Sequence, residues 1–70
     1  MNEAKLTIGE ILRLLRNRAG YSQRKLAEKS MICHASIYRY EKDLADPPYS
    51  VLQDLLKAMG YELRIVRKEK

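Results

Sequence analysis

The sequence contains one cysteine and one histidine, which are neighbours at Cys33 and His34. A thiol and an imidazole are the side chains of metal sites and of nucleophilic catalysis, but both chemistries need partner residues. With a single cysteine and a single histidine, neither a Cys/His zinc cluster nor an intramolecular disulfide is available. No motif places a serine or a second cysteine beside His34, and there is no glycine-rich phosphate loop. The sequence therefore predicts that the chain is not an enzyme and binds no metal or cofactor.

The charge of the chain is strongly basic. Fourteen lysine and arginine residues against 9 aspartate and glutamate residues give a net charge of +5. This balance favours a polyanionic partner such as nucleic acid. A basic protein whose charge only keeps it in solution fits the charge equally well, so charge alone does not decide between the two.

Length and hydropathy limit the class of protein. A chain of 70 residues forms one domain, and a domain this small buries only ~60% of the surface of its unfolded chain, so self-association is the expected source of extra stability. No apolar run approaches the ~18 residues of a membrane span, and residues 1–5 lack the apolar stretch of a signal peptide. A lone free thiol suits a reducing compartment. We therefore expect a cytoplasmic protein without a membrane partner.

Local signals define a first helix. Thr7 and Glu10 fit a capping box, and the apolar residues that follow recur at helical spacing. Gly20 can end the helix in a left-handed conformation, which predicts a helix over residues 8–19. The inward stripe of this helix is predicted to consist of Ile8, Leu12 and Leu15. Two further apolar residues, Ile11 and Leu14, then need cover from another element.

Two shorter helices follow. Ser22 is an N-cap residue and predicts a second helix over residues 23–29. After a short break, a third helix is predicted over residues 34–42, with Cys33 at the cap position and Ile37 on the inner face.

Proline and glycine delimit the last helix. Residues 46–48 close a loop, because proline cannot continue a helix but is accepted in its first turn. A fourth helix is predicted over residues 49–59, and it stops at Gly60. Its buried residues are predicted to be Leu52, Leu55, Leu56 and Met59.

The periodicity changes after Gly60. Apolar and charged residues alternate over residues 61–65, which is typical of a half-buried strand and predicts one strand within residues 61–67. A lone strand leaves its backbone donors and acceptors without partners. Antiparallel pairing with the same strand of a second copy would satisfy them and would cover Tyr61, Leu63 and Ile65. In the alternative, residues 61–67 fold back over their own helices as an extended segment.

The spacing of residues 23–42 fits a helix-turn-helix. Small Ala27 stands where the two helices cross, Ile32 follows the turn, and Ile37 anchors the second helix in the core. Over residues 8–60 the sequence resembles the phage lambda repressor/Cro-like helix-turn-helix family. The matching stretches are Gly20 to Ser30, Ser36 to Glu41, and Pro47 with Leu52 to Gly60. Their most specific parts are Ser22-Gln23, Leu26-Ala27, and Glu41 followed by Pro47.

The resemblance implies an all-α fold, a four-helix lambda-repressor-like bundle with a helix-turn-helix, here extended by the C-terminal β-strand that pairs across a dimer. The single domain would be 1–70, with its core at 7–60. The sequence departs from the family at three positions. Met31 stands where the turn usually has glycine, Cys33 replaces a serine or threonine cap, and Asp43 replaces the glycine after the third helix. A methionine with positive φ costs of order 1 kcal/mol, whereas aspartate tolerates this conformation better.

The resemblance also implies site residues. In this family the start of the third helix enters the major groove, where base edges are distinguishable. The base-reading positions carried over are Cys33, His34, Ala35, Tyr38 and Arg39. Arg39 could donate two hydrogen bonds to guanine O6 and N7. For each residue the alternative is an ordinary surface side chain, and for Cys33 a plain cap residue is favoured over a redox switch.

Further residues would hold the DNA backbone and the motif itself. The helix N-terminus that begins at Gln23 points amide donors at a phosphate. The backbone-contacting residues implied are Gln23, Arg24, Lys42 and Ser50. Arg16 and Glu41 match a family pair that joins the first helix to the end of the third, which implies a structural ion pair.

The function implied is sequence-specific binding of double-stranded DNA by a homodimeric transcriptional repressor on a roughly palindromic operator. Residues 59–68 are also similar to the end of helix-turn-helix antitoxins from toxin–antitoxin operons, which would add autoregulation and a toxin protein as partner. Two alternatives remain. One is a phage- or plasmid-type repressor without a toxin, and the other is a protein-interaction module whose charge is incidental.

Overall fold

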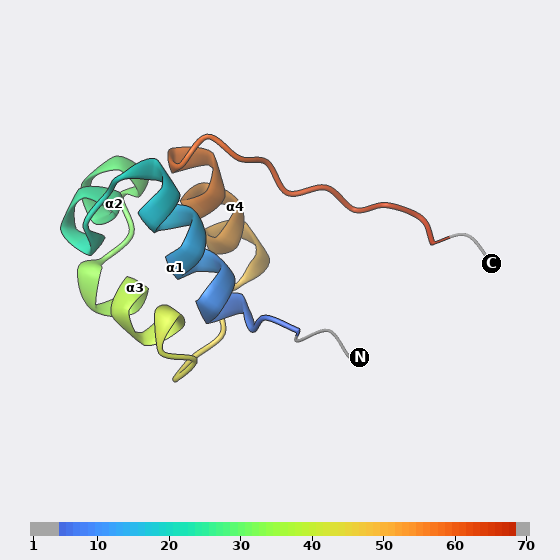
Figure 1. Cartoon of the computed structure of the whole chain (residues 1–70), viewed down its shortest axis with the longest axis horizontal. Coiled ribbons are helices and arrows are strands. Elements are labelled where there is room, and N and C mark those ends of the chain that lie inside the picture. The colour runs from blue at the N-terminus through green and yellow to red at the C-terminus, as the bar shows by residue number, and fades with distance from the viewer. Residues whose placement is uncertain (1–4, 69–70) are drawn as a thin grey trace.

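The computed structural model describes residues 5–68 and contains four helices joined by short loops (Figure 1). They are α1 (Ile8–Ala19), α2 (Gln23–Ser30), α3 (His34–Glu41) and α4 (Tyr49–Ala58). The four predicted helices are confirmed. The bounds of α1 are as predicted, α2 ends one residue later than predicted, and α3 and α4 each end one residue earlier.

Side chains that cap the helices explain these bounds. The Thr7 hydroxyl accepts a hydrogen bond from the Glu10 amide, and the Glu10 carboxylate accepts one from the Thr7 amide, so the capping box is complete. Gly20 ends α1 at φ 77°, in the left-handed region. The Ser22 hydroxyl accepts from the Lys25 amide and starts α2. Each of these contacts is local in sequence, and together they set both ends of α1 and the start of α2.

The core lies where the four helices meet. It is formed by Leu12, Leu26, Ile37, Leu55, Leu56 and Met59. Four of these side chains, one from each helix, are almost completely buried. Helix α1 packs against α3, and α2 packs against both α3 and α4. The helix pair α2–α3 is therefore held from both sides by α1 and α4.

The predicted inward stripe of α1 is partly wrong. Leu12 is buried and Leu15 packs against the core, but Ile8 is 40% exposed and does not belong to the core cluster. Gly9 is the buried residue of this first turn. A Cβ atom at this position would lie 2.5 Å from the Tyr40 carbonyl oxygen and 2.7 Å from that of Glu41. The start of α1 therefore meets the end of α3 so closely that only glycine fits, and Ile8 is turned outward.

No strand is present in residues 5–68, so the strand predicted within residues 61–67 is not found in the single chain. Pairing needs a second strand, and the described chain supplies none. Residues 61–68 instead leave the bundle as an extended segment (Figure 1). In the fold-back alternative, residues 61–67 would lie over their own helices. Leu63 does pack against the core. Beyond it the alternative fails, because Ile65 and Val66 are 85% and 78% exposed.

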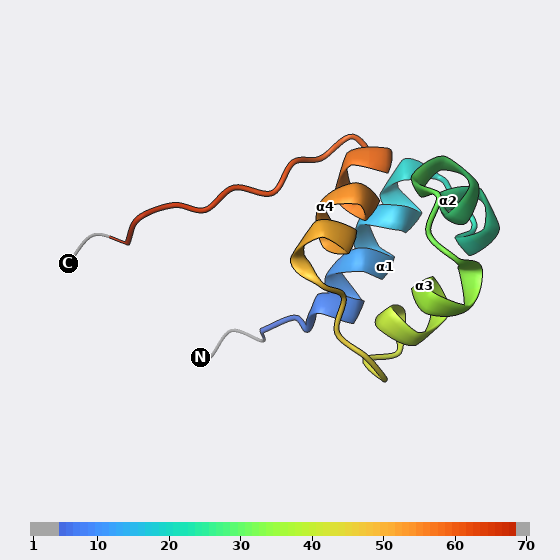
Figure 2. The same cartoon turned by 180° about the vertical axis from the view of Figure 1, so that it is seen from behind.

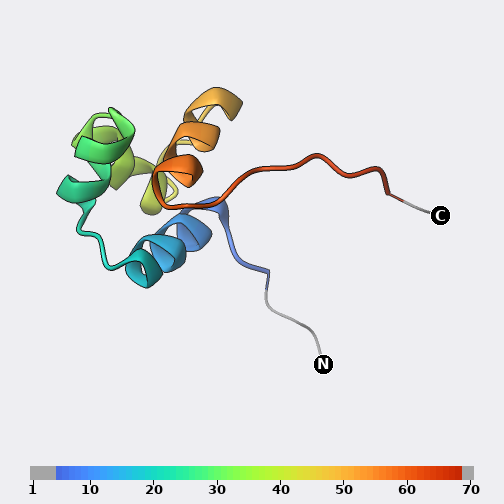
Figure 3. The same cartoon turned by 90° about the horizontal axis from the view of Figure 1, so that it is seen from above.

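The two ends of the described chain leave the bundle on the side away from the helix pair α2–α3. The view from behind (Figure 2) and the view from above (Figure 3) agree on this for residues 5–7 and 61–68. The outer surface of α2–α3 is therefore left uncovered by the chain ends that the structure describes. None of the helices within residues 5–68 is long and apolar enough to cross a bilayer.

Candidate nucleic-acid interface

Helix α3 has one buried face and one exposed face. Ile37 and Glu41 are buried, while Ser36 and Tyr40 are half-buried beside them. The residues predicted to read bases are all exposed, and they are Cys33, His34, Ala35, Tyr38 and Arg39. Each of His34, Ala35, Tyr38 and Arg39 lies one, three or four residues from at least two of the others, so they share the outer face of the helix. The structure thus places the predicted residues together on one open surface, and their contact with bases stays a prediction.

The residues predicted to hold the DNA backbone are spread over three elements. Arg24 is exposed in the first turn of α2, Lys42 is exposed directly after α3, and Ser50 is exposed in the first turn of α4. The Lys42 ammonium lies 5.7 Å from the centre of the Tyr38 ring, at cation–π distance. Gln23 differs from these three because it is half-buried and forms hydrogen bonds within the protein.

An ion pair joins α1 to the end of α3. Arg16 Nε lies 2.7 Å from Glu41 Oε2, and Arg16 Nη2 donates to Glu41 Oε1 at 2.8 Å. The two side chains are only 12% and 3% exposed. Arg16 Nη1 also donates to the Tyr21 carbonyl at 3.0 Å. This two-pronged pair fixes the C-terminal end of α3 on α1.

Glu41 changes the pKa of the Arg16 guanidinium. The hydrogen bonds with Glu41 raise the pKa of Arg16 above its ordinary value, and the Coulomb attraction of Glu41 acts in the same direction, although burial lowers it. The Arg16 guanidinium therefore stays charged throughout the physiological pH range.

Polar contacts extend from this ion pair to the surface of α3, which the sequence did not predict. Gln23 Nε2 donates to Glu41 Oε1 at 3.1 Å, and the other end of the Gln23 amide lies 3.1 Å from His34 Nε2. One series of polar contacts therefore runs from α1 through α3 and α2 to the first residue of α3. The signal available in the sequence was only that Gln23 begins α2 and His34 begins α3, and the contact between them depends on the angle of the turn.

The turn between α2 and α3 contains the departures from the family pattern. Met31 caps α2 with φ 63° and is 88% exposed, so its side chain gains no packing in return for the strained backbone. Cys33 occupies the N-cap position of α3 but forms no side-chain capping hydrogen bond. The turn itself contains one side-chain hydrogen bond, in which the Ser30 hydroxyl accepts from the Ile32 amide at 3.2 Å.

Asp43 has a role that the sequence did not show. Its φ is 59°, the left-handed conformation that its position suggested. Its carboxylate accepts from the Gly9 amide at 3.1 Å and from the Thr7 hydroxyl at 2.7 Å. An acidic side chain is favourable at a helix N-terminus, so Asp43, in the loop after α3, caps the start of α1.

Comparison with known protein families also identifies a helix-turn-helix in this chain. A helix-turn-helix family model matches residues 12–66, which is most of the chain. This chain belongs to the lambda repressor/Cro-like helix-turn-helix family. The family membership supports a DNA-binding transcriptional regulator as the function class.

The relatives found share this helix-turn-helix sequence but are longer. The HTH-type transcriptional regulators PuuR of Escherichia coli (strain K12) and of Shigella flexneri are each 40% identical to the chain over 63 residues. The match covers 90% of the chain and 34% of each relative, so the chain spans about a third of their length. No solved structure matches the chain.

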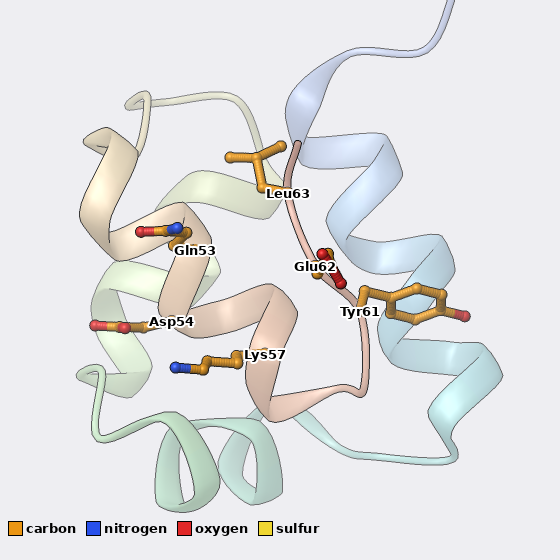
Figure 4. A pocket seen from close by; sticks show the side chains of 6 residues that line it. All are labelled: Gln53, Asp54, Lys57, Tyr61, Glu62 and Leu63. Carbon is orange, nitrogen blue, oxygen red and sulfur yellow. The ribbon is translucent and has the colours of Figure 1, made fainter. Parts of the chain in front are cut away.

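Within residues 5–68, no three histidine, cysteine, aspartate or glutamate side chains are close enough to bind a metal ion. A pocket lies between α4 and the segment that follows it (Figure 4). It is lined by Gln53, Asp54, Lys57, Tyr61, Glu62 and Leu63. None of these residues belongs to α2 or α3, so the pocket is separate from the helix-turn-helix surface.

Proposed function

We propose that this chain binds double-stranded DNA sequence-specifically through α3 and represses transcription. The main support is the division of α3 into a buried face and an exposed polar face. Ile37 and Glu41 hold the helix on the bundle, while His34, Tyr38 and Arg39 extend from the opposite side. An α-helix presented in this way has the dimensions to enter the major groove.

Base contacts and phosphate contacts would contribute differently to DNA binding. Arg39 would donate two hydrogen bonds to guanine O6 and N7, which supplies sequence discrimination. Arg24 and Lys42 would lie against phosphates, and these contacts position the protein without reading the sequence. The backbone amides at the start of α2 would add donors for one phosphate.

The test compares Arg39→Ala with Arg24→Ala. The operator is first selected from random duplexes with the wild-type chain, and binding is then measured by fluorescence anisotropy at fixed salt. Arg39→Ala should weaken operator binding about 5- to 150-fold, as expected for a lost bidentate contact, and should barely change binding to random DNA. Arg24→Ala should weaken both to a similar degree, since phosphate contacts carry no sequence information. Equal losses from the two variants on both DNAs would contradict the proposed reading surface.

A homodimer that pairs through residues 61–67 is part of this proposal. Tyr61, Ile65 and Val66 are exposed apolar residues on a segment whose backbone has no strand partner within residues 5–68. Leu14 on α1 adds exposed apolar surface that a second copy could cover. A two-fold dimer would place two recognition helices about 34 Å apart, one turn of DNA, and predicts a roughly palindromic operator.

Light scattering tests the dimer. The full chain should be dimeric at tens of micromolar, and deletion of residues 61–70 should give a monomer. Because Leu63 packs on the core, Ile65→Asp is the milder variant, and it should also give a monomer. A monomeric full-length protein, or a dimeric deletion variant, would refute pairing through this segment.

The kind of repressor is a separate proposal. We favour a repressor without a toxin partner, because the family match extends to residue 66 and the relatives matched over 63 residues are named as transcriptional regulators. The antitoxin of a toxin–antitoxin operon is the second candidate, favoured by the exposed Ile65 and Val66, which a partner protein could cover. Copurification of a second polypeptide would identify the antitoxin. Failure to bind any duplex even at low salt would point instead to a protein-interaction module.

A further inference from the structure

A fixed order of donors and acceptors connects the interior of the protein to His34. Both carboxylate oxygens of Glu41 accept short hydrogen bonds from Arg16, at 2.7 and 2.8 Å. Gln23 contacts Glu41 Oε1 at 3.1 Å and must therefore turn its amide nitrogen toward it. The carbonyl oxygen of the same amide is then the atom that lies 3.1 Å from His34 Nε2.

This order determines where the proton of the imidazole sits. A carbonyl oxygen only accepts, so the Nε2 atom of His34 must donate and carry the hydrogen. In the neutral imidazole the other nitrogen, Nδ1, is then a hydrogen-bond acceptor. Among residues 5–68, no side chain or backbone group forms a hydrogen bond with Nδ1, and His34 is exposed in the first turn of α3.

We propose that Gln23 holds His34 in the Nε2–H tautomer and that Nδ1 then accepts a hydrogen bond from the exocyclic amino group of a base in the major groove. This inference rests on the proposed DNA binding. In the major groove only adenine N6 and cytosine N4 donate, whereas guanine and thymine present acceptors there. His34 would thus recognise an amino group, which complements the guanine acceptors assigned to Arg39. Gln23 acts as a positioning residue in this scheme.

The tautomer can be measured without DNA. His34 is the only histidine in the sequence, so its two ring nitrogens are identified at once in a long-range ¹H–¹⁵N NMR spectrum of the neutral form. The wild-type chain should show the Nε2–H tautomer alone. Gln23→Met keeps the length of the side chain but removes the acceptor, and should give a mixture of tautomers. Gln23→Lys replaces the acceptor by a donor and should shift the population toward Nδ1–H. A wild-type Nδ1–H tautomer, or populations unchanged in both variants, would overturn the assignment.

The base contact is tested on the selected operator. The base pair whose preference disappears in His34→Ala is substituted in two ways, by removing the exocyclic amino group or by replacing the purine N7 with carbon. Loss of the amino group should weaken wild-type binding about three- to tenfold, as expected for one hydrogen bond, and should leave His34→Ala binding unchanged. The N7 substitution should change neither protein.

The two readouts separate this inference from the proposed function. If the N7 substitution weakens wild-type binding and the amino substitution does not, His34 donates and the inference is wrong while DNA binding stands. If no duplex is bound, the proposed function itself fails, and with it the base contact, whereas the NMR experiment still decides the role of Gln23.

Discussion

Replacement of Arg16 by methionine should leave the carboxyl group of Glu41 buried and almost without hydrogen-bond partners. Glu41 is 3% exposed and would retain a single donor, Gln23 Nε2 at 3.1 Å. Loss of one partner of a buried ion pair costs about 3–5 kcal/mol, and the deep burial of Glu41 places Arg16→Met in the upper part of that range. A chain of 70 residues has a free energy of unfolding of roughly 4–10 kcal/mol, so this variant should lose from about two-fifths to all of its stability.

The reverse replacement should cost less. In Glu41→Leu, Arg16 keeps its hydrogen bond to the Tyr21 carbonyl, and its longer side chain, already 12% exposed, can reach water. The double variant removes both charges and should regain about 2 kcal/mol relative to the sum of the two single losses.

Urea unfolding followed by circular dichroism measures these free energies. Arg18→Met is the control, because it removes an exposed arginine from the same helix outside the proposed dimer segment, and it should change stability by less than about 0.5 kcal/mol. Because the pKa of Arg16 is raised in the folded chain, the stability that its charge contributes is fully present below the ordinary arginine pKa. This stability is lost only as the pH rises through the pKa of the folded chain. This pair should therefore cause no change in stability around neutral pH. Strict additivity of Arg16→Met and Glu41→Leu would refute the argument.

Three further substitutions test the backbone, each by thermal unfolding. Gly9→Ala should destabilise the chain by about 1–3 kcal/mol, because the new Cβ would lie 2.5 Å from the Tyr40 carbonyl oxygen, and an unchanged melting temperature would show that α1 and α3 approach less closely. Met31→Gly should stabilise by up to about 1 kcal/mol, since it relieves a φ of 63° at an exposed side chain. Asp43→Gly relieves a similar φ of 59° but should destabilise by about 1 kcal/mol, because hydrogen bonds to Gly9 and Thr7 are lost. Changes of the same sign for Met31→Gly and Asp43→Gly would contradict this distinction.

The sequence by itself determined the helices and the family. The capping contacts of Thr7 with Glu10 and of Ser22 with Lys25 span three residues, and Gly20 ends its helix through its own backbone freedom. Interactions of this range depend on the local chain alone, so the residue order is sufficient to predict them. The exposed face of α3 also follows from the sequence, because helical periodicity puts Ile37 inside and Arg39 outside.

Only the tertiary structure decided how these elements meet. Ile8 fits the apolar stripe of α1, yet it is exposed, because the crossing of α1 and α3 leaves room only for Gly9. Asp43 reaches the start of α1 from 34 residues away in the sequence, and Gln23 reaches His34 across the turn. Periodicity and capping report which side of a helix is apolar and where it ends, but they carry no information on the distance and angle between two helices. Those depend on how the core side chains pack together, and a strand over residues 61–67 likewise depends on a partner outside the single chain.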